Sequence, residues 1–220
     1  MDYKIIKANL FDVAQITANA IADNGDLKVM PADFYKQFDQ MDISTFCVQQ
    51  GCYSLPTNEL IQCLRDEIGE EEKVIEIAGG NGLLARELGI VSTDSYVQKL
   101  NPKVRLHYAK IQQPIVKYGN NVAPLEALEA VKRHKPKIII VAWGTHKFDR
   151  KAPLESGYDY GIDFKKIMAY PSVEKIILIG DLEIHKFNPI HKNATRIIQE
   201  DWIVSRSTRN KNAIMIYEKQ

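Results

Sequence analysis

The amino-acid sequence predicts an α/β protein with a doubly wound, mostly parallel sheet. From residue 73 onward, apolar runs alternate with segments whose apolar residues recur at helical spacing. Two of the runs, KIIIVAW and KIILIG, are apolar almost without interruption, as in strands buried on both faces of a parallel sheet. A glycine-rich turn, GGNG, follows the first run and leads directly into a helical segment. Alternation of this kind is typical of an open sheet with helices on both faces.

The first part of the chain, residues 1–72, is expected to be a helical cover or lid. FDVAQITANAIADNG has apolar residues at helical spacing and a plausible end at Gly25. MPADFYKQFDQM opens with Pro31, which is favourable in a first helical turn. In LPTNELIQCLRDEIG, Thr57 can cap the helix and Gly69 can end it.

The remainder, residues 73–220, is expected to form the core. Its predicted strands are Val74–Ala78, Ile90–Thr93, Val104–Ala109, Ile138–Trp143 and Lys175–Gly180. Helical segments lie between them, namely GLLARELG, APLEALEAVKRHK and DFKKIMAY. At the end of the chain, WIVSRS and AIMIYEK are joined by the polar turn TRNKN. A short polar link between strands predicts a C-terminal antiparallel hairpin.

The composition is that of an ordinary globular chain, with 45% hydrophobic and 26% charged residues among 220. The formal net charge of +1 provides no global basic field for nucleic acid or an anionic membrane, although local patches remain open. No apolar run approaches the roughly 20 residues of a membrane span, and the N-terminus lacks the apolar region of a signal peptide. We therefore expect a cytoplasmic protein. The uneven spacing of Cys47, Cys52 and Cys63 predicts free thiols, with neither a disulfide framework nor a zinc site.

The glycine-rich turn is the strongest indication of function. Glycines 79, 80 and 82 permit backbone angles closed to other residues and let a ligand touch the main chain at the carboxyl end of a strand. GNGLLA also fits the G-x-G-x-x-G/A pattern of dinucleotide-binding proteins. Two acidic residues point elsewhere. Glu76 precedes the glycines, where a carboxylate suits an ammonium group rather than a pyrophosphate, and Asp94 follows Gly80 sooner than the dinucleotide acid does.

In VIEIAGGNGLL and VSTDSY the chain resembles the class I S-adenosylmethionine-dependent methyltransferases, over roughly residues 50 to 220. The resemblance implies a Rossmann-like core with a seven-stranded sheet and S-adenosylmethionine as cofactor. It places Glu76 near the amino group of the cofactor, Gly80 and Gly82 along it, and Asp94 on the ribose hydroxyls. Ala78 stands where the family has a glycine, which is tolerable if its φ is negative. The expected cofactor-binding residues are Glu76, Ala78, Gly79, Gly80, Gly82, Asp94, Tyr96, Tyr53 and Trp143.

The catalytic candidates lie in VAWGTHKFD, after the fourth strand that the resemblance implies. Trp143 could be an apolar wall or a cation–π partner of the sulfonium, and His146 could be a general base. Core packing for the tryptophan and an exposed loop for the histidine are the plain alternatives. Tyr53 could close the pocket and Tyr96 could stack on adenine, although Tyr53 could equally be a packing residue.

Two further polar clusters are less specific. Asp181, Glu183 and His185 follow the fifth strand and could line the same mouth, but their spacing is not that of a metal site and no metal is expected. RSTRNKN contains Arg206 and Arg209, which fit a solvated turn or a phosphate or RNA contact.

The sequence thus predicts methyl transfer to an unidentified acceptor. A small molecule or protein is favoured over DNA, because the N/D-P-P-Y motif of amino-group methylation and a separate target-recognition segment are both missing, and RNA stays open. The alternatives are a non-catalytic methyltransferase-like binding protein and an NAD-dependent oxidoreductase. The sequence does not indicate the oligomeric state.

Overall fold

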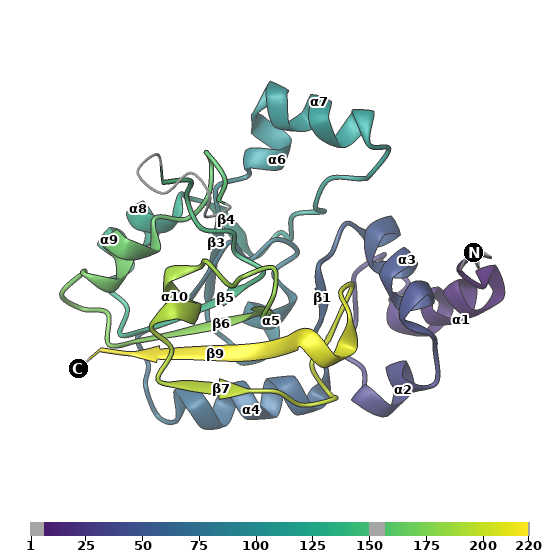
Figure 1. Cartoon of the computed structure of the whole chain (residues 1–220), viewed down its shortest axis with the longest axis horizontal. Coiled ribbons are helices and arrows are strands. Elements are labelled where there is room, and N and C mark those ends of the chain that lie inside the picture. Colours follow the sequence, from purple (N-terminus) through teal and green to yellow (C-terminus); the bar gives the residue numbers. More distant parts are fainter. Residues whose placement is uncertain (1–6, 150–156, 220) are drawn as a thin grey trace, which may run out of the picture.

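The computed structural model describes residues 7–149 and 157–219 (Figure 1). Its centre is a seven-stranded sheet in the order β4-β3-β2-β5-β6-β9-β7. Neighbours from β4 to β6 pair in parallel, whereas β9 runs antiparallel to both β6 and β7. The strands are β2 (Val74–Ile77), β3 (Val91–Asp94), β4 (Val122–Pro124), β5 (Ile138–Ala142), β6 (Lys175–Asp181), β7 (Arg196–Ile198) and β9 (Asn212–Glu218). This is the doubly wound, mostly parallel, seven-stranded sheet that was predicted.

Helices cover both faces of this sheet, and the strands are apolar on both sides as a result. On β6, Ile176 and Leu178 belong to the core beneath one set of helices, while Ile177 and Ile179 belong to the core beneath the other. The first set comprises α8 (Ala127–His134), α9 (Phe164–Met168) and α10 (Pro189–Lys192). The second set comprises α4 (Asn58–Ile68) and α5 (Leu83–Leu88). The expectation for KIIIVAW and KIILIG is confirmed.

The N-terminal helices form a smaller body with its own apolar core, packed at one end of the sheet (Figure 1). They are α1 (Leu10–Ala20), α2 (Ala32–Lys36) and α3 (Gln40–Gln50). Leu83 of α5 and Val204 pack into this core and connect the two bodies. A two-stranded ribbon adds a second connection, because β1 (Ser54–Leu55) pairs with β8 (Val204–Ser205). The helical character of this region is confirmed, and its role as a lid stays a prediction.

The predicted strand Val104–Ala109 is wrong, because these residues lie in helix α7 (Pro102–Lys110). Asn101 caps that helix with its side chain, which accepts hydrogen bonds from the backbone N–H groups of residues 103 and 104, and Pro102 occupies the first turn. The strand beside β3 is β4 instead. A short helix, α6 (Val97–Leu100), precedes α7, and both stand out from the body at the top of Figure 1. We call residues 95–121 the α6–α7 insertion.

The predicted antiparallel pairing of WIVSRS with AIMIYEK at the end of the chain is wrong. The strand next to β9 at the sheet edge is β7, whereas the WIVSRS segment leaves the sheet and pairs with β1. Asn212 holds this arrangement, because its amide donates to the Ile203 carbonyl at 2.8 Å and accepts from Ser205 Oγ at 2.6 Å. The polar TRNKN link contains a 3-10 turn, η1 (Arg209–Lys211).

The predicted state of the cysteines is confirmed. Cys47 and Cys52 are buried, Cys63 is half-buried, and all three are free thiols. Within the described ranges, every helix is too short or too polar to cross a membrane.

Candidate functional site

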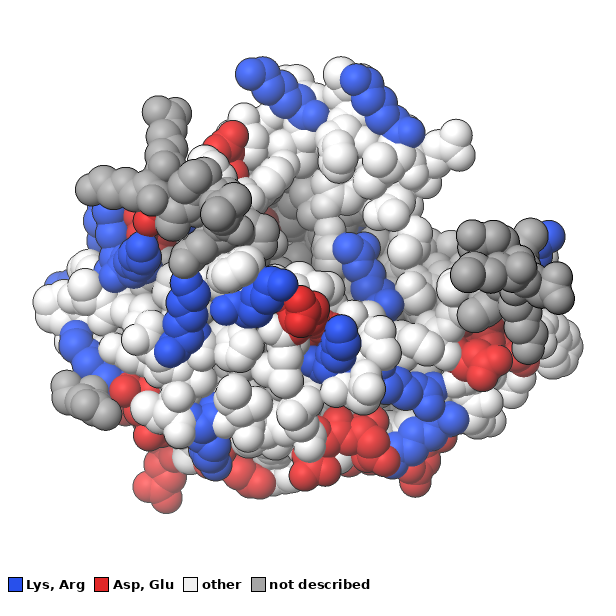
Figure 2. All heavy atoms as spheres, viewed as in Figure 1, with Lys and Arg blue, Asp and Glu red and all other residues white. Residues whose placement is uncertain are grey.

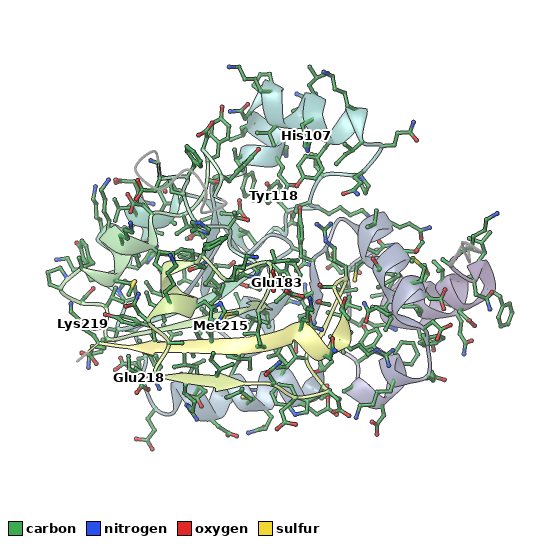
Figure 3. All side chains as sticks on the ribbon, viewed as in Figure 1. His107, Tyr118, Glu183, Met215, Glu218 and Lys219 are labelled. Carbon is green, nitrogen blue, oxygen red and sulfur yellow. The ribbon has the colours of Figure 1, made fainter. Side chains whose placement is uncertain are left out.

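A cavity of about 460 Å³ opens at the carboxyl ends of β2, β3 and β5. Strand order runs outward from β2 in both directions, to β3 on one side and β5 on the other, so the cavity lies at the topological switch point. Its walls come from the turns after these strands, from residues 51–56 and from the α6–α7 insertion. Figure 3 labels two lining residues on the insertion, His107 on α7 and Tyr118 on the returning segment.

The turn after β2 passes through three left-handed residues. Gly80 and Gly82 have φ of 55° and 70°, as glycine readily allows. Ala78 has φ of 53°, so the condition of a negative φ, under which alanine would be tolerable at this position, is not met. A side chain in this conformation costs roughly 1–2 kcal/mol, and alanine has the smallest side chain that could bear it. Hydrogen bonds hold the turn, with Gly79 donating to the Thr93 carbonyl at 3.0 Å.

Glu76 is buried beside this turn. Its side chain alternates with Ile75 and Ile77 along β2, so it lies on the α5 side of the sheet and accepts a 2.7 Å hydrogen bond from Ser92 Oγ. Burial raises the pKa of Glu76 to about 8, against the opposing effect of the hydrogen bonds from Ser92 and the Ala85 backbone. The carboxyl is therefore largely protonated at neutral pH, and a cation in the cavity would favour its ionised form.

Because Gly79 has no side chain, the Glu76 side chain can occupy the space beside it. A Cβ at this position would lie 2.0 Å from Ser92 Oγ and 2.6 Å from Glu76 Oε2. We expect Gly79→Ala to lower the free energy of unfolding by about 1–3 kcal/mol, because the pair of side chains must move. Gly79 does not have a positive φ, so this loss measures the contact and not a left-handed alanine. Urea denaturation measures it, and an unchanged free energy of unfolding would show that Ser92 and Glu76 accommodate the added Cβ without cost.

Asp94 ends β3 on the other side of the turn. One carboxylate oxygen accepts the Gly80 N–H at 3.2 Å and the other accepts the Tyr96 N–H at 2.8 Å. Burial raises the pKa of Asp94, and these two hydrogen bonds oppose that shift. Each carboxylate oxygen has a further lone pair. The group is thus fixed by the backbone and can still accept two donors from a ligand, as a pair of neighbouring hydroxyls would supply.

Aromatic residues line the same cavity as the two carboxyls. Tyr53 shares a 2.6 Å hydrogen bond between hydroxyls with Tyr108, and its ring lies 6.1 Å from that of Trp143. The Arg206 guanidinium stacks over the Tyr53 ring at 3.9 Å. Within the described residues, the indole N–H of Trp143 is buried without a hydrogen-bond partner, an arrangement that favours a ligand acceptor.

His185 lines the cavity beside Trp143, whereas the other lining histidine, His107, lies on the insertion. The His185 ring packs edge-on against Trp143 at 5.5 Å and closely against Gly180, where a Cβ would be 2.6 Å from the ring. Its Nδ1 lies 3.1 Å from the Asp181 backbone nitrogen and 3.0 Å from the Asp181 carbonyl oxygen. In the tautomer that donates Nδ1–H to this carbonyl, Nε2 is the acceptor nitrogen. Burial lowers the pKa of His185, so the ring is neutral at physiological pH and can take up a proton.

The structure gathers seven of the ten predicted site residues around the cavity: Tyr53, Glu76, Ala78, Gly79, Gly80, Asp94 and Trp143. The other three do not line it. Gly82 packs against Asn121, and Tyr96 stacks on Tyr118 at 4.0 Å with its hydroxyl on the Val122 carbonyl. His146 is buried and paired through its backbone with Ile162, so neither the exposed-loop alternative nor a place in the cavity lining holds for it.

Some lining residues went unrecognised in the sequence, among them Tyr108 and Tyr118 of the insertion, whose helix looked like a strand. Arg206, for which a solvated turn and a phosphate or RNA contact were the alternatives, belongs to the cavity lining. The Asn101-Pro102 pair was the available indication of a helix there. Asp181, Glu183 and His185 do not form a metal site. Across the described part of the chain, no group of three or more potential ligands could hold an ion.

No protein-family model matches the chain, and no curated protein matches it in sequence. Among solved structures, the 23S rRNA methyltransferase ErmE is 11% identical, covering 74% of this chain and 68% of its own at a TM-score of 0.37. Streptococcus pneumoniae Sp1610, described as a candidate tRNA methyltransferase, is 11% identical. The match covers 74% of this chain and 70% of Sp1610, at a TM-score of 0.38. A protein of the NADB-Rossmann superfamily from Streptococcus agalactiae is 9% identical. The match covers 74% of this chain and 69% of that protein, at a TM-score of 0.38. Similarities this low say nothing about ligand or reaction.

Proposed function

We propose that the protein binds S-adenosylmethionine in this cavity and transfers its methyl group to an acceptor. The observation that carries the proposal is the pair of carboxyls, Glu76 and Asp94, which flank the glycine turn on adjoining strands at the switch point. A pyrophosphate would meet two acidic groups there. A ligand with an ammonium group and two ribose hydroxyls would meet a complementary partner for each.

The residues present fit the parts of this cofactor. Glu76 would face the ammonium group, Asp94 would accept the ribose hydroxyls, and the open backbone of Gly79 and Gly80 allows close approach. Trp143 offers an aromatic ring to a sulfonium. These assignments agree with the cofactor-binding roles that the sequence resemblance implied.

The cofactor would supply a methyl group on a sulfonium, taken by the acceptor in an in-line displacement that leaves the electron pair on sulfur. The chain's own residues would orient the acceptor and exclude water. Tyr53 and Tyr108 line the cavity and are joined through their hydroxyls. Where the acceptor atom carries a proton, neutral His185 in the cavity lining can receive it on Nε2.

Calorimetric titration with S-adenosylmethionine, S-adenosylhomocysteine and NAD in parallel tests the proposal. We expect micromolar binding of the first two and none of NAD, because the dinucleotide brings a pyrophosphate to the carboxyls. Binding of NAD alone would move the protein to the oxidoreductases, which the GNGLLA match keeps as the second candidate. Binding of none of the three would refute a nucleotide site at the turn.

A non-catalytic binding protein would give the same titration, so turnover needs its own measurement. Transfer of label from methyl-labelled S-adenosylmethionine to a panel of small molecules, proteins and RNA separates the two. Binding without transfer to any member of such a panel would support the non-catalytic alternative.

A further inference from the structure

The α6–α7 insertion carries positive charge only. Residues 95–121 contain no aspartate or glutamate, although the whole chain is nearly neutral at +1. Its cations are Lys99, Lys103, Arg105, Lys110 and Lys117, and all five are exposed. None of them has a salt-bridge partner in the described parts of the chain. Elsewhere cations are commonly paired, as Lys137 is with Glu71 and Arg196 with Glu67. A concentrated, unpaired charge of this kind favours an anionic partner.

The insertion is fixed next to the cavity. Its returning segment is tied to the glycine turn, where Gly119 donates to the Gly80 carbonyl at 3.2 Å and Asn121 donates to the Gly82 carbonyl at 2.8 Å. Lys and Arg side chains stand over α6 and α7 at the top of Figure 2, and the surface beneath them is hollowed. An anion held on the insertion would therefore lie at the mouth of the proposed site.

Helix α7 has one side toward the cavity and another toward solvent. Val104, His107 and Tyr108 line the cavity and lie on one face at helical spacing (His107 is labelled in Figure 3). Lys103 and Lys110 lie on the same helix but outside the lining. The helix thus joins an aromatic contact inside the cavity to basic contacts outside it.

The cavity has an aromatic lining, which we call the aromatic compartment. It consists of Tyr53, Tyr108, Tyr158, Tyr160 and Trp143, and Arg206 stacks on the Tyr53 ring. Aromatic faces and stacked guanidinium groups bind flat rings, and each stacked base in nucleic-acid complexes contributes measurably to affinity.

We propose that the insertion and this aromatic compartment bind single-stranded RNA, with phosphates on the insertion and one unstacked base in the cavity. The proposal rests on the proposed function, since it names the acceptor of that site. A base must be free of its stack to enter such a pocket, which favours a single strand over a duplex. An anionic membrane is the competing partner, because Leu100, Leu106 and Ile111 of the insertion are exposed apolar residues. Binding to a membrane surface, however, would not explain the aromatic side chains inside the cavity.

Fluorescence anisotropy with a labelled single-stranded RNA of about 16 nucleotides tests the proposal. The triple variant Lys103→Ala, Arg105→Ala, Lys110→Ala is expected to bind at least tenfold more weakly than the wild type. The slope of log Kd against log salt should fall by about 2, since each lost phosphate contact on a single strand accounts for about 0.7. The control is Lys28→Ala, Lys132→Ala, Arg133→Ala, which removes the same charge from exposed positions outside the insertion and should bind normally.

A second variant tests the compartment itself. Tyr108→Leu keeps the charge of α7 and removes an aromatic ring, so it should weaken RNA binding without changing the salt slope. S-adenosylhomocysteine titration of the basic triple variant separates the two proposals, because its affinity should be unchanged. Normal RNA binding with no S-adenosylhomocysteine binding would defeat the proposed function alone. Equal RNA affinity of the two triple variants, or binding only to vesicles containing phosphatidylserine, would overturn the RNA assignment.

Discussion

Replacing Asp94 with alanine is expected to weaken S-adenosylhomocysteine binding by at least tenfold. Both carboxylate oxygens point at backbone N–H groups and retain lone pairs toward the cavity, so two ribose hydroxyls can bind the same group. Hydrogen bonds to a charged acceptor contribute about 1.5–3 kcal/mol each, and one such bond already corresponds to tenfold or more in affinity. Calorimetric titration of wild type and variant measures the difference directly.

Asp94→Asn is the matched control for this prediction. It keeps the size of the side chain and one acceptor oxygen, which preserves a contact to either Gly80 or Tyr96, but it loses the charge and the second acceptor. Its affinity should lie between those of wild type and Asp94→Ala. The melting temperature of each variant shows whether the turn survives. An alanine variant that is folded and binds as tightly as wild type would show that the ligand does not contact Asp94.

The elements that the sequence predicted correctly are those whose evidence is local. The apolar composition of KIILIG alone predicts a strand buried on both faces. Glu76 and the glycines are close together in one continuous stretch of sequence. Asp94 comes at the end of the next strand, so parallel pairing of β2 with β3 was enough to bring it to the same edge. Chain order and the rules of parallel sheets fix such positions.

The failures concern contacts that chain order does not determine. VRLHYA alternates apolar and polar residues as a strand does, which suggested a strand. In the structure Val104 is the only buried residue of α7, so this segment has too little buried apolar surface for a strand inside the sheet. Tyr108 therefore entered the site only through the packing of a helix. WIVSRS has the composition of a strand, but its partner depends on Asn212 and on distant Ser54 and Leu55. His185 and His146 both follow buried strands, and only packing decides which one lines the cavity.

Replacing Glu76 with glutamine is expected to remove a pH dependence of stability that the wild type shows. Burial raises the pKa of Glu76 from 4.5 to about 8 in the folded protein. Below the unfolded value both states hold the proton, and between the two values only the folded state does. The free energy of unfolding therefore falls as pH rises from about 4.5 to about 8, and above that pH the loss is complete. A shift of this size corresponds to a few kcal/mol, at about 1.4 kcal/mol for each pH unit.

Glutamine resembles the protonated acid in size and can still accept the hydrogen bond from Ser92. We expect Glu76→Gln to unfold at higher urea concentration than wild type at pH above about 8 and to show a flatter profile between about pH 5 and 8. Glu72→Gln, at an exposed carboxyl shortly before β2, should keep the wild-type profile. Superimposable profiles for the Glu76 variant and wild type would mean that this carboxyl is already ionised in the folded protein.

Although Glu76→Gln should raise stability at high pH, it should lower the affinity for S-adenosylhomocysteine. An ammonium group in the cavity stabilises the ionised form of Glu76, so wild-type affinity for S-adenosylhomocysteine should rise with pH as the carboxyl gives up its proton. Glu76→Gln cannot ionise, and its affinity should be lower and independent of this titration. Gain of stability with loss of ligand would show that the buried acid is kept for binding at a cost to the fold. A variant that gains stability and binds normally would instead assign Glu76 to the support of the turn alone.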